Sequence, residues 1–204
     1  MPTIIAILSE KGGSGKTTIS VNLASALENT LVVDTDPQQS ALGWSDLRDE
    51  GPAVVKVGKA SISDVRRLAS DYEHVILDGA PRLTEVMEEA VKVSDLVVIP
   101  TQPSAMDIWS AEPVTELCKR HGTRAVFCLS RGVVGSTLTD SAREALESFD
   151  LPVLEGTRQR VSYVRSLNAG KSVLESGDEK AAEEIRQLKD DVLAYMHTDT
   201  QTDA

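Results

Sequence analysis

The glycine-rich segment Ser-Glu-Lys-Gly-Gly-Ser-Gly-Lys-Thr-Thr, at positions 9–18, constrains the fold more than any other part of the chain. It follows an apolar run, residues 3–8, that is typical of a buried strand, and it precedes residues 19–27, whose apolar spacing is typical of a helix. Glycines let consecutive backbone N–H groups converge on one point, and the N-terminus of the following helix attracts negative charge. The segment therefore predicts a phosphate-binding loop in an α/β fold.

The second half of this loop fits the common pattern G-x-x-x-x-G-K-[ST]. Gly15, Lys16 and Thr17 occupy the last three positions, whereas Glu10 stands where the first glycine is expected. In this pattern the lysine contacts the β- and γ-phosphates and the hydroxyl contacts Mg²⁺. Lys11 adds a second cation beside the loop. The alternative, an ordinary strand–turn–helix corner, leaves the Gly-Lys-Thr sequence at the junction unexplained.

The sequence Lys-Gly-Gly-Ser-Gly-Lys-Thr-Thr at positions 11–18 resembles the deviant Walker A box of the ParA/MinD family of ATPases. The resemblance implies that ATP and Mg²⁺ are the cofactors and that ATP closes a homodimer. It implies catalytic roles for Lys11, Lys16 and Asp36, with Lys11 reaching the phosphates of the partner subunit. The residues it implies for ATP binding, the last two at the adenine, are Lys11, Gly12, Gly13, Ser14, Gly15, Lys16, Thr17, Thr18, Arg131 and Thr157.

Carboxylates follow two further apolar runs. Asp34 and Asp36 lie at the end of residues 31–34, and Asp78 ends the run 74–78. Ligands of open α/β sheets bind at the carboxyl ends of the strands. A turn with a helix cap is the alternative for the first pair. The resemblance implies that Asp34 is structural, that Asp36 positions the attacking water, and that Thr17, Asp36 and Asp78 hold Mg²⁺ with its water shell.

Strand and helix patterns alternate along the remaining chain, which predicts a doubly wound, mostly parallel sheet with helices on both faces. Hydrophobic residues make up 41% of the chain and aromatic residues 3%, so the core must be aliphatic, as buried parallel strands require. We expect one domain over residues 1–196 and a polar, disordered tail over 197–204. The remaining expected strands are 53–57, 95–100, 124–129 and 152–154, and the remaining helices are 41–47, 61–70, 83–93, 138–149 and 178–196.

Charge and cysteine usage exclude several classes of protein. The formal net charge is −11, which argues against a surface that is basic throughout. Cys118 and Cys128 are too far apart in sequence for a close-spaced metal pair, so we expect buried thiols in a reducing, cytoplasmic compartment. No apolar run reaches the roughly 20 residues of a membrane span. The acidic tail also lacks a basic amphipathic helix, so no membrane binding is expected.

A local basic cluster follows residue 157 in this acidic chain. It contains Arg158, Arg160, Arg165 and Lys171, with Tyr163 among them. Such cations contact the phosphates of DNA without reading sequence. The alternative is a solvated face whose arginines pair with neighbouring acids. The resemblance favours non-specific DNA binding, because family members use basic residues in their C-terminal part.

The positions of three large side chains and one proline are ambiguous. Trp44 is expected in the core, with an interface as the alternative. Met106 and Trp109 fit the core and an interface equally well, and Pro113 suggests a helix kink.

Taken together, the motifs and the resemblance imply a partition or positioning ATPase with slow basal turnover that a partner stimulates. The expected partners are a ParB-like or other small adaptor and non-specific DNA, and the ATP form would be nucleoid-associated. The cargo could be a plasmid, a chromosome or another body. The alternatives are a P-loop ligase of the dethiobiotin synthetase type and a nucleotide-dependent structural polymer. An electron-transfer ATPase like nitrogenase iron protein is disfavoured by the positions of Cys118 and Cys128.

Overall fold

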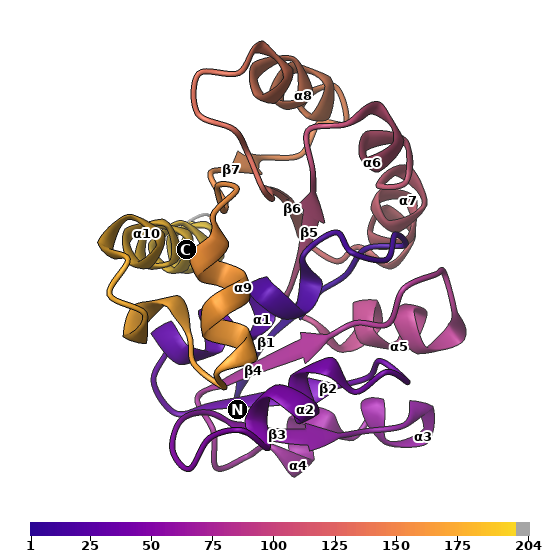
Figure 1. Ribbon diagram of the computed structural model, residues 1–204. Coiled ribbons are helices and arrows are strands. Elements are labelled where there is room, and N and C mark those ends of the chain that lie inside the picture. The colour runs from indigo at the N-terminus through magenta and orange to yellow at the C-terminus, as the bar shows by residue number, and fades with distance from the viewer. Residues whose placement is uncertain (199–204) are drawn as a thin grey trace.

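The computed structural model describes residues 1–198, apart from the side chains of residues 59 and 60, and is built on one parallel sheet (Figure 1). The seven strands have the order β3-β2-β4-β1-β5-β6-β7, and every pairing is parallel, as the sequence predicted. The strands are β1 (Thr3–Ile7), β2 (Thr30–Asp34), β3 (Ala53–Lys56), β4 (His74–Asp78), β5 (Leu96–Thr101), β6 (Ala125–Leu129) and β7 (Val153–Leu154).

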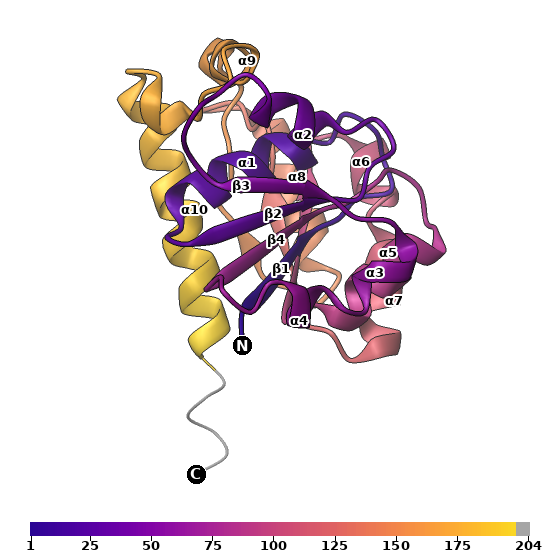
Figure 2. The ribbon, with the colours of Figure 1, turned by 90° about the horizontal axis from the view of Figure 1, so that it is seen from below.

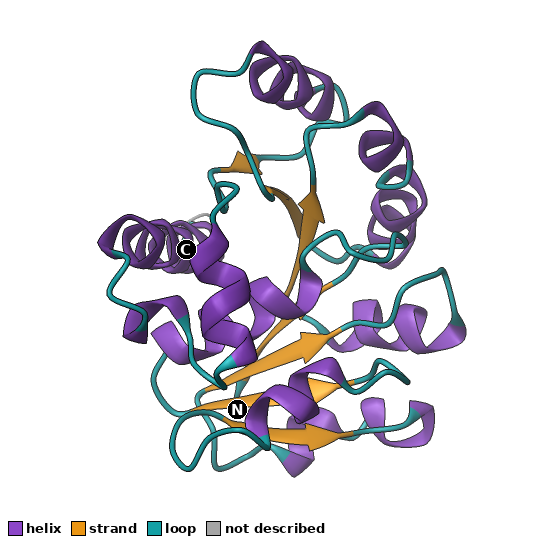
Figure 3. Cartoon of the chain, in the orientation of Figure 1, coloured by secondary structure: helices purple, strands orange, loops and turns teal. Residues whose placement is uncertain are grey.

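Helices cover both faces of the sheet (Figures 2 and 3). On one face α1, α2 and α10 bury their apolar side chains, and on the other α4, α5, α7 and α8 do so. Alternate residues of β1 divide between the two layers, with Ile4 and Ala6 on one side and Ile5 and Ile7 on the other. The helices are α1 (Lys16–Ala26), α2 (Ser40–Ser45), α3 (Lys59–Ile62), α4 (Val65–Leu68), α5 (Glu85–Val93), α6 (Ala105–Trp109), α7 (Glu112–His121), α8 (Thr137–Glu147), α9 (Val161–Asn168), the 3₁₀ turn η1 (Val173–Glu175) and α10 (Glu179–His197).

Strand β1 lies at the point where the chain order of the sheet reverses. Its neighbours are β4 and β5, so the connections on its two sides run to opposite halves of the sheet. Loops separate at such a point and leave a crevice beyond the carboxyl ends of the strands. In the register of the sheet, Asp78 is level with both Ile7 and Asp34. The three loops that the sequence singled out therefore start side by side.

Two sequence predictions about helices were wrong. The expected helix over 61–70 is instead two short helices, α3 and α4, joined through Ser63 and Asp64. These residue types favour turns over helix interiors, because their side chains compete for backbone hydrogen bonds. Pro113 does not kink a helix; it lies in the first turn of α7, where its missing N–H leaves no bond unmade.

The core predictions differ in outcome for the large side chains. Trp44 is 4% exposed and packs in the core, as expected. Met106 and Trp109 are each 69% exposed, which rules out the core for both. Cys118 and Cys128 are buried free thiols, as predicted, and burial raises the pKa of both to about 12.

The C-terminal helix runs one residue further than expected. It ends at His197, and residues 199–204 of the predicted tail lie outside the described part of the chain. None of the helices described within residues 1–198 is long and apolar enough to cross a membrane.

Candidate functional site

The loop between β1 and α1 has a backbone that only glycine adopts without strain. Gly13 has φ 76° and Gly15 has φ 104°, both in the left-handed region. A Cβ atom at Gly15 would also approach Ser130 Oγ to 2.6 Å. A Cβ atom at Gly12 would meet no described atom within 4 Å beyond its neighbours in the chain, so that side of the loop is open. The loop leads directly into α1, whose first residue is Lys16.

Lys16 folds back over this loop. Its side chain is buried, and Nζ donates a hydrogen bond to the Lys11 carbonyl oxygen at 3.0 Å. Burial lowers the pKa of this ammonium, and the nearby charges of Asp78 and Asp36 partly offset the effect. Ser14 Oγ is buried without a hydrogen-bond partner in the described residues. A desolvated cation, an unpartnered hydroxyl and an open glycine backbone together suit a phosphate group.

Asp78 forms a second polar centre beneath the loop. It is fully buried, and its two oxygens accept hydrogen bonds from Thr17 Oγ1 and Ser20 Oγ, each at 2.8 Å. Thr35 anchors the same residue by donating to its carbonyl oxygen at 2.9 Å. Hydroxyl and carboxylate oxygens are the ligands that Mg²⁺ prefers. The donor set therefore fits a magnesium ion with part of its water shell.

Burial also changes the acidity of Asp78. It raises the pKa of this carboxyl from 3.8 to about 7, although Thr17 and Ser20 donate to it. Because the folded pKa lies above the unfolded value, the ionised carboxylate opposes folding. The penalty is absent below about pH 4, grows as the pH rises, and is complete above about pH 7.

Asp78→Asn should therefore stabilise the metal-free and nucleotide-free protein at alkaline pH. We expect a gain of a few kcal/mol in the free energy of unfolding near pH 8, shrinking to none near pH 4. Urea unfolding in EDTA at several pH values measures it, with Asp140→Asn as an exposed control on α8. A gain that does not change with pH would contradict this account of the site.

Asp34 and Asp36 have different surroundings. Asp34 is fully buried and accepts hydrogen bonds from the N–H groups of Asp36, Ala41 and Leu42 at 2.9 to 3.1 Å. It therefore fixes the loop between β2 and α2, the structural role expected of it. Asp36 is half-buried, and its Oδ1 accepts from the Gln38 N–H at 2.9 Å. Against the effect of burial, its negative charge raises the pKa of Lys16, so the two side chains lie close enough to interact electrostatically.

Lys11 lies in a contact that the sequence did not predict. Its Nζ is 2.5 Å from Asp107 Oδ2 on α6 of the same chain. The Asp107 side chain is buried. The Ser104 side chain caps α6 by accepting a hydrogen bond from the backbone N–H of Asp107. The Ser-x-x-Asp spacing signals a helix start, but nothing in the sequence indicates that Lys11 is its partner.

A cavity of about 710 Å³ opens beside the N-terminus of α1. Gly15 lines it from the phosphate loop and Thr18 from the first turn of α1, and Arg131 and Thr157 line it from the loops after β6 and β7. The Arg131 N–H donates to Thr157 Oγ1 at 3.2 Å, so the structure brings these two sequence-predicted residues together. The volume suits the nucleoside part of a nucleotide whose phosphates lie in the loop.

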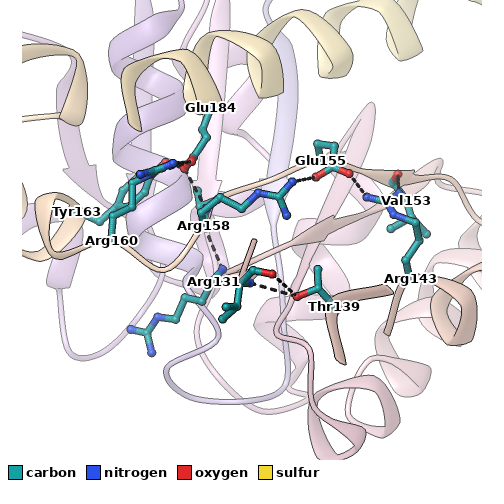
Figure 4. Close-up of polar contacts among 11 residues, drawn as sticks. Arg131, Thr139, Arg143, Val153, Glu155, Arg158, Arg160, Tyr163 and Glu184 are labelled. Carbon is teal, nitrogen blue, oxygen red and sulfur yellow. Dashed lines mark hydrogen bonds and ion pairs between the residues drawn. The ribbon is translucent and has the colours of Figure 1, made fainter. Parts of the chain in front are cut away.

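The predicted basic cluster is partly neutralised by acids (Figure 4). Arg158 pairs with Glu155 at 2.7 Å, and Arg160 pairs with Glu184 on α10 at 2.6 Å. Arg165 on α9 and Lys171 are exposed. For Arg158 and Arg160 the structure thus shows the intramolecular pairing that the sequence left open.

Comparison with protein families gives a match over almost the whole chain. Residues 5–201 match the CobQ/CobB/MinD/ParA nucleotide-binding domain. The chain belongs to this family. Membership in the ParA/MinD group makes it a P-loop ATPase whose cofactors are ATP and Mg²⁺, in agreement with the loop and the carboxylate described above.

Several curated proteins resemble this ParA/MinD-family chain in sequence. Maintenance of carboxysome distribution protein A from Halothiobacillus neapolitanus is 28% identical over 206 residues, covering 93% of this chain and 95% of that protein. The protein of the same name from Gloeobacter kilaueensis is 38% identical over 116 residues, or 52% of each chain. Sporulation initiation inhibitor protein Soj from Bacillus subtilis is 31% identical over 149 residues, 50% of this chain and 59% of that protein. The match thus spans only about half the length of the last two.

Solved structures share the fold of this family member. McdA from Cyanothece in its apo form superposes with a TM-score of 0.81 at 17% identity, covering 94% of this chain and 100% of that chain. MinD from Pyrococcus horikoshii complexed with Mg-ADP gives a TM-score of 0.78 at 20% identity, covering 95% and 98%. The doubly wound P-loop fold expected from the sequence is confirmed.

Proposed function

We propose that this chain is an ATP-dependent dimerising ATPase that positions a large intracellular cargo, with a carboxysome as the first candidate. The observation that carries the proposal is the end-to-end similarity to a carboxysome distribution protein, which covers 93% of this chain and 95% of that protein. The chromosome partitioning protein ParA of Myxococcus xanthus is a further relative over 48% of this chain, and chromosome or plasmid partition is therefore the second candidate.

The proposed chemistry is in-line attack of water on the γ-phosphate of ATP. Lys16 and the loop N–H groups bind the phosphates and stabilise the developing negative charge. Thr17 and Asp78 hold Mg²⁺, which neutralises phosphate charge when it is bound. Asp36 orients the water, and Lys11 of one subunit reaches the phosphates of the other. Arg131 and Thr157 contact the adenine in the cavity beside α1.

The proposed cycle uses DNA as the surface along which cargo moves. ATP closes the dimer, the dimer binds DNA without sequence preference, and hydrolysis stimulated by a small adaptor, ParB-like or otherwise, releases it. In this proposal the protein is cytoplasmic and becomes nucleoid-associated when ATP is bound. Because Arg158 and Arg160 pair with acids, Arg165 and Lys171 carry most of the proposed DNA contact.

Binding to random-sequence duplex DNA at low salt should require ATP–Mg²⁺ and should be absent with ADP or without nucleotide. Arg165→Ala and Lys171→Ala should each weaken binding, and each should reduce the slope of log affinity against log salt by about one. Fluorescence anisotropy at several salt concentrations measures both effects.

The matched control is Arg67→Ala, which removes an exposed arginine on α4 and should leave DNA binding unchanged. Binding that is equal in all nucleotide states would contradict the proposed cycle. An absence of binding in every state would remove DNA from the proposal and favour the structural polymer, which sedimentation with ATP would detect. A metabolic ligase would instead show ATP turnover only with an added small-molecule substrate.

A further inference from the structure

One wall of the cavity beside α1 is a single segment of chain, residues 157–164, which runs from the loop after β7 into α9. All residues of this cavity wall except Ser162 line the cavity. Its first part is joined to the loop after β6 through the backbone. The Gly132 N–H donates to the Thr157 carbonyl oxygen at 2.9 Å, and the Gln159 N–H donates to the Gly132 carbonyl oxygen at 3.0 Å.

The cavity wall is tied to the C-terminal helix α10 by one carboxylate, that of Glu184 (Figure 4). Its Oε2 accepts hydrogen bonds from the Arg158 N–H at 3.0 Å and from the Tyr163 hydroxyl at 2.9 Å. Its Oε1 accepts from Arg160 Nε at 2.7 Å. The Glu184 side chain is only 13% exposed. One buried carboxylate therefore fixes the backbone of the cavity wall and two of its side chains.

The contacts of Glu184 are separate from those that fix the phosphate loop. Within residues 1–198, every hydrogen bond accepted by the Glu184 carboxylate comes from the cavity wall. The phosphate loop and the start of α1 are instead held by bonds of Lys16 to the Lys11 carbonyl oxygen and of Thr17 to Asp78. A change at Glu184 should therefore alter the cavity wall and leave the phosphate loop intact.

We propose that Glu184 is a positioning residue for the nucleoside, which holds the cavity wall in the shape that receives the base and the ribose and does not act on the phosphates. This inference rests on the proposed placement of the nucleoside in this cavity. A carboxylate suits the role, because both of its oxygens accept. The Arg158 N–H and the Arg160 guanidinium only donate, and they bind different oxygens, so an amide at position 184 can serve only one of them.

Glu184→Gln tests this role through two ligands that differ only in the nucleoside, Mg-ADP and Mg-pyrophosphate. We expect the Kd for Mg-ADP to rise about tenfold, because a buried donor loses its acceptor and the cavity wall is no longer preorganised. The Kd for Mg-pyrophosphate should stay within about twofold, because this ligand reaches only the phosphate loop. Isothermal titration calorimetry measures both. ADP is used because it is not hydrolysed and, in the proposed cycle, does not close the dimer.

Two further variants make the result specific. Glu183→Gln changes the preceding residue of α10, whose side chain is 68% exposed and pairs with Arg186, and should alter neither Kd. Tyr163→Phe removes one donor from Glu184 and should raise the Kd for Mg-ADP alone by about threefold, which tests the cluster even if Glu184→Gln does not fold. Equal weakening of both ligands would overturn the proposal, as would an unchanged Kd for Mg-ADP.

A labelling experiment separates this inference from the proposed placement of the nucleoside. Val161 is 65% exposed and lines the cavity, whereas Cys118 and Cys128 are buried, so a maleimide should label Val161→Cys selectively. Mg-ADP should slow the labelling and Mg-pyrophosphate should not. If both ligands act alike, the nucleoside placement is wrong and the role of Glu184 falls with it. If only Mg-ADP protects and Glu184→Gln binds it as Glu183→Gln does, the placement stands and the positioning role is wrong.

Discussion

Asp36→Ala should reduce ATP turnover by about 10²- to 10⁴-fold while ATP still closes the dimer. The reason is the position of Asp36 on the short loop between β2 and α2. Asp34 fixes the backbone of that loop by accepting three N–H groups, so the loop keeps its course when the Asp36 side chain is removed. Lys16, Thr17 and Asp78, the proposed nucleotide and metal ligands, should stay in place.

Turnover and assembly must be measured on the same sample for this variant. Phosphate release gives kcat, and light scattering after size exclusion gives the dimer fraction with ATP and with ADP. Asp36→Asn is the matched control, because it keeps an acceptor for the Gln38 N–H and removes only the charge. We expect Asp36→Asn to behave like Asp36→Ala. Hydrolysis at the wild-type rate in either variant would contradict the proposed catalytic role of Asp36.

Lys11→Ala should abolish the ATP-dependent dimer and lower turnover by about 10²- to 10³-fold or more, with nucleotide binding to the single subunit retained. The first two effects follow from the proposed reach of Lys11 to the partner's phosphates. Retained binding follows from the structure, because the phosphate loop keeps Lys16, its glycines and the backbone carbonyl of residue 11, which accepts from Lys16 Nζ.

Lost stability must be separated from lost function in this variant, since it leaves Asp107 unpaired. The double variant with Asp107→Asn provides the control. It should recover stability in urea unfolding and should still fail to form the dimer. A fluorescent ATP analogue measures nucleotide binding in parallel. An unchanged dimer and unchanged turnover in Lys11→Ala would contradict the partner-subunit role.

Local patterns in the sequence were sufficient for the fold class and for the position of the phosphate loop. Apolar runs predicted the seven strands within one or two residues, because a strand buried on both faces must be apolar along its length. The Gly-Lys-Thr sequence at positions 15–17 predicted a strand–loop–helix corner. The left-handed backbone that this corner requires at position 15 is one that glycine adopts without strain. The pattern was less informative at residues 61–70, where Ser63 and Asp64 divide the expected helix.

The sequence could not predict which charges pair across the fold. It identified Arg158 and Arg160 as basic residues, but not that Glu155 and Glu184 neutralise them. Glu184 lies on α10, and its distance from Arg160 depends on how that helix packs.

The sequence by itself thus determined the parallel sheet, the phosphate loop and the carboxylates that follow β2 and β4. Only the tertiary structure decided that Asp34 and Asp78 lie level in neighbouring strands, and that Lys11 is held by a buried Asp107. The physical reason is the range of each interaction. Backbone conformation and burial pattern are set by neighbouring residues, whereas an ion pair between residues 96 positions apart exists only after the whole sheet has brought them together.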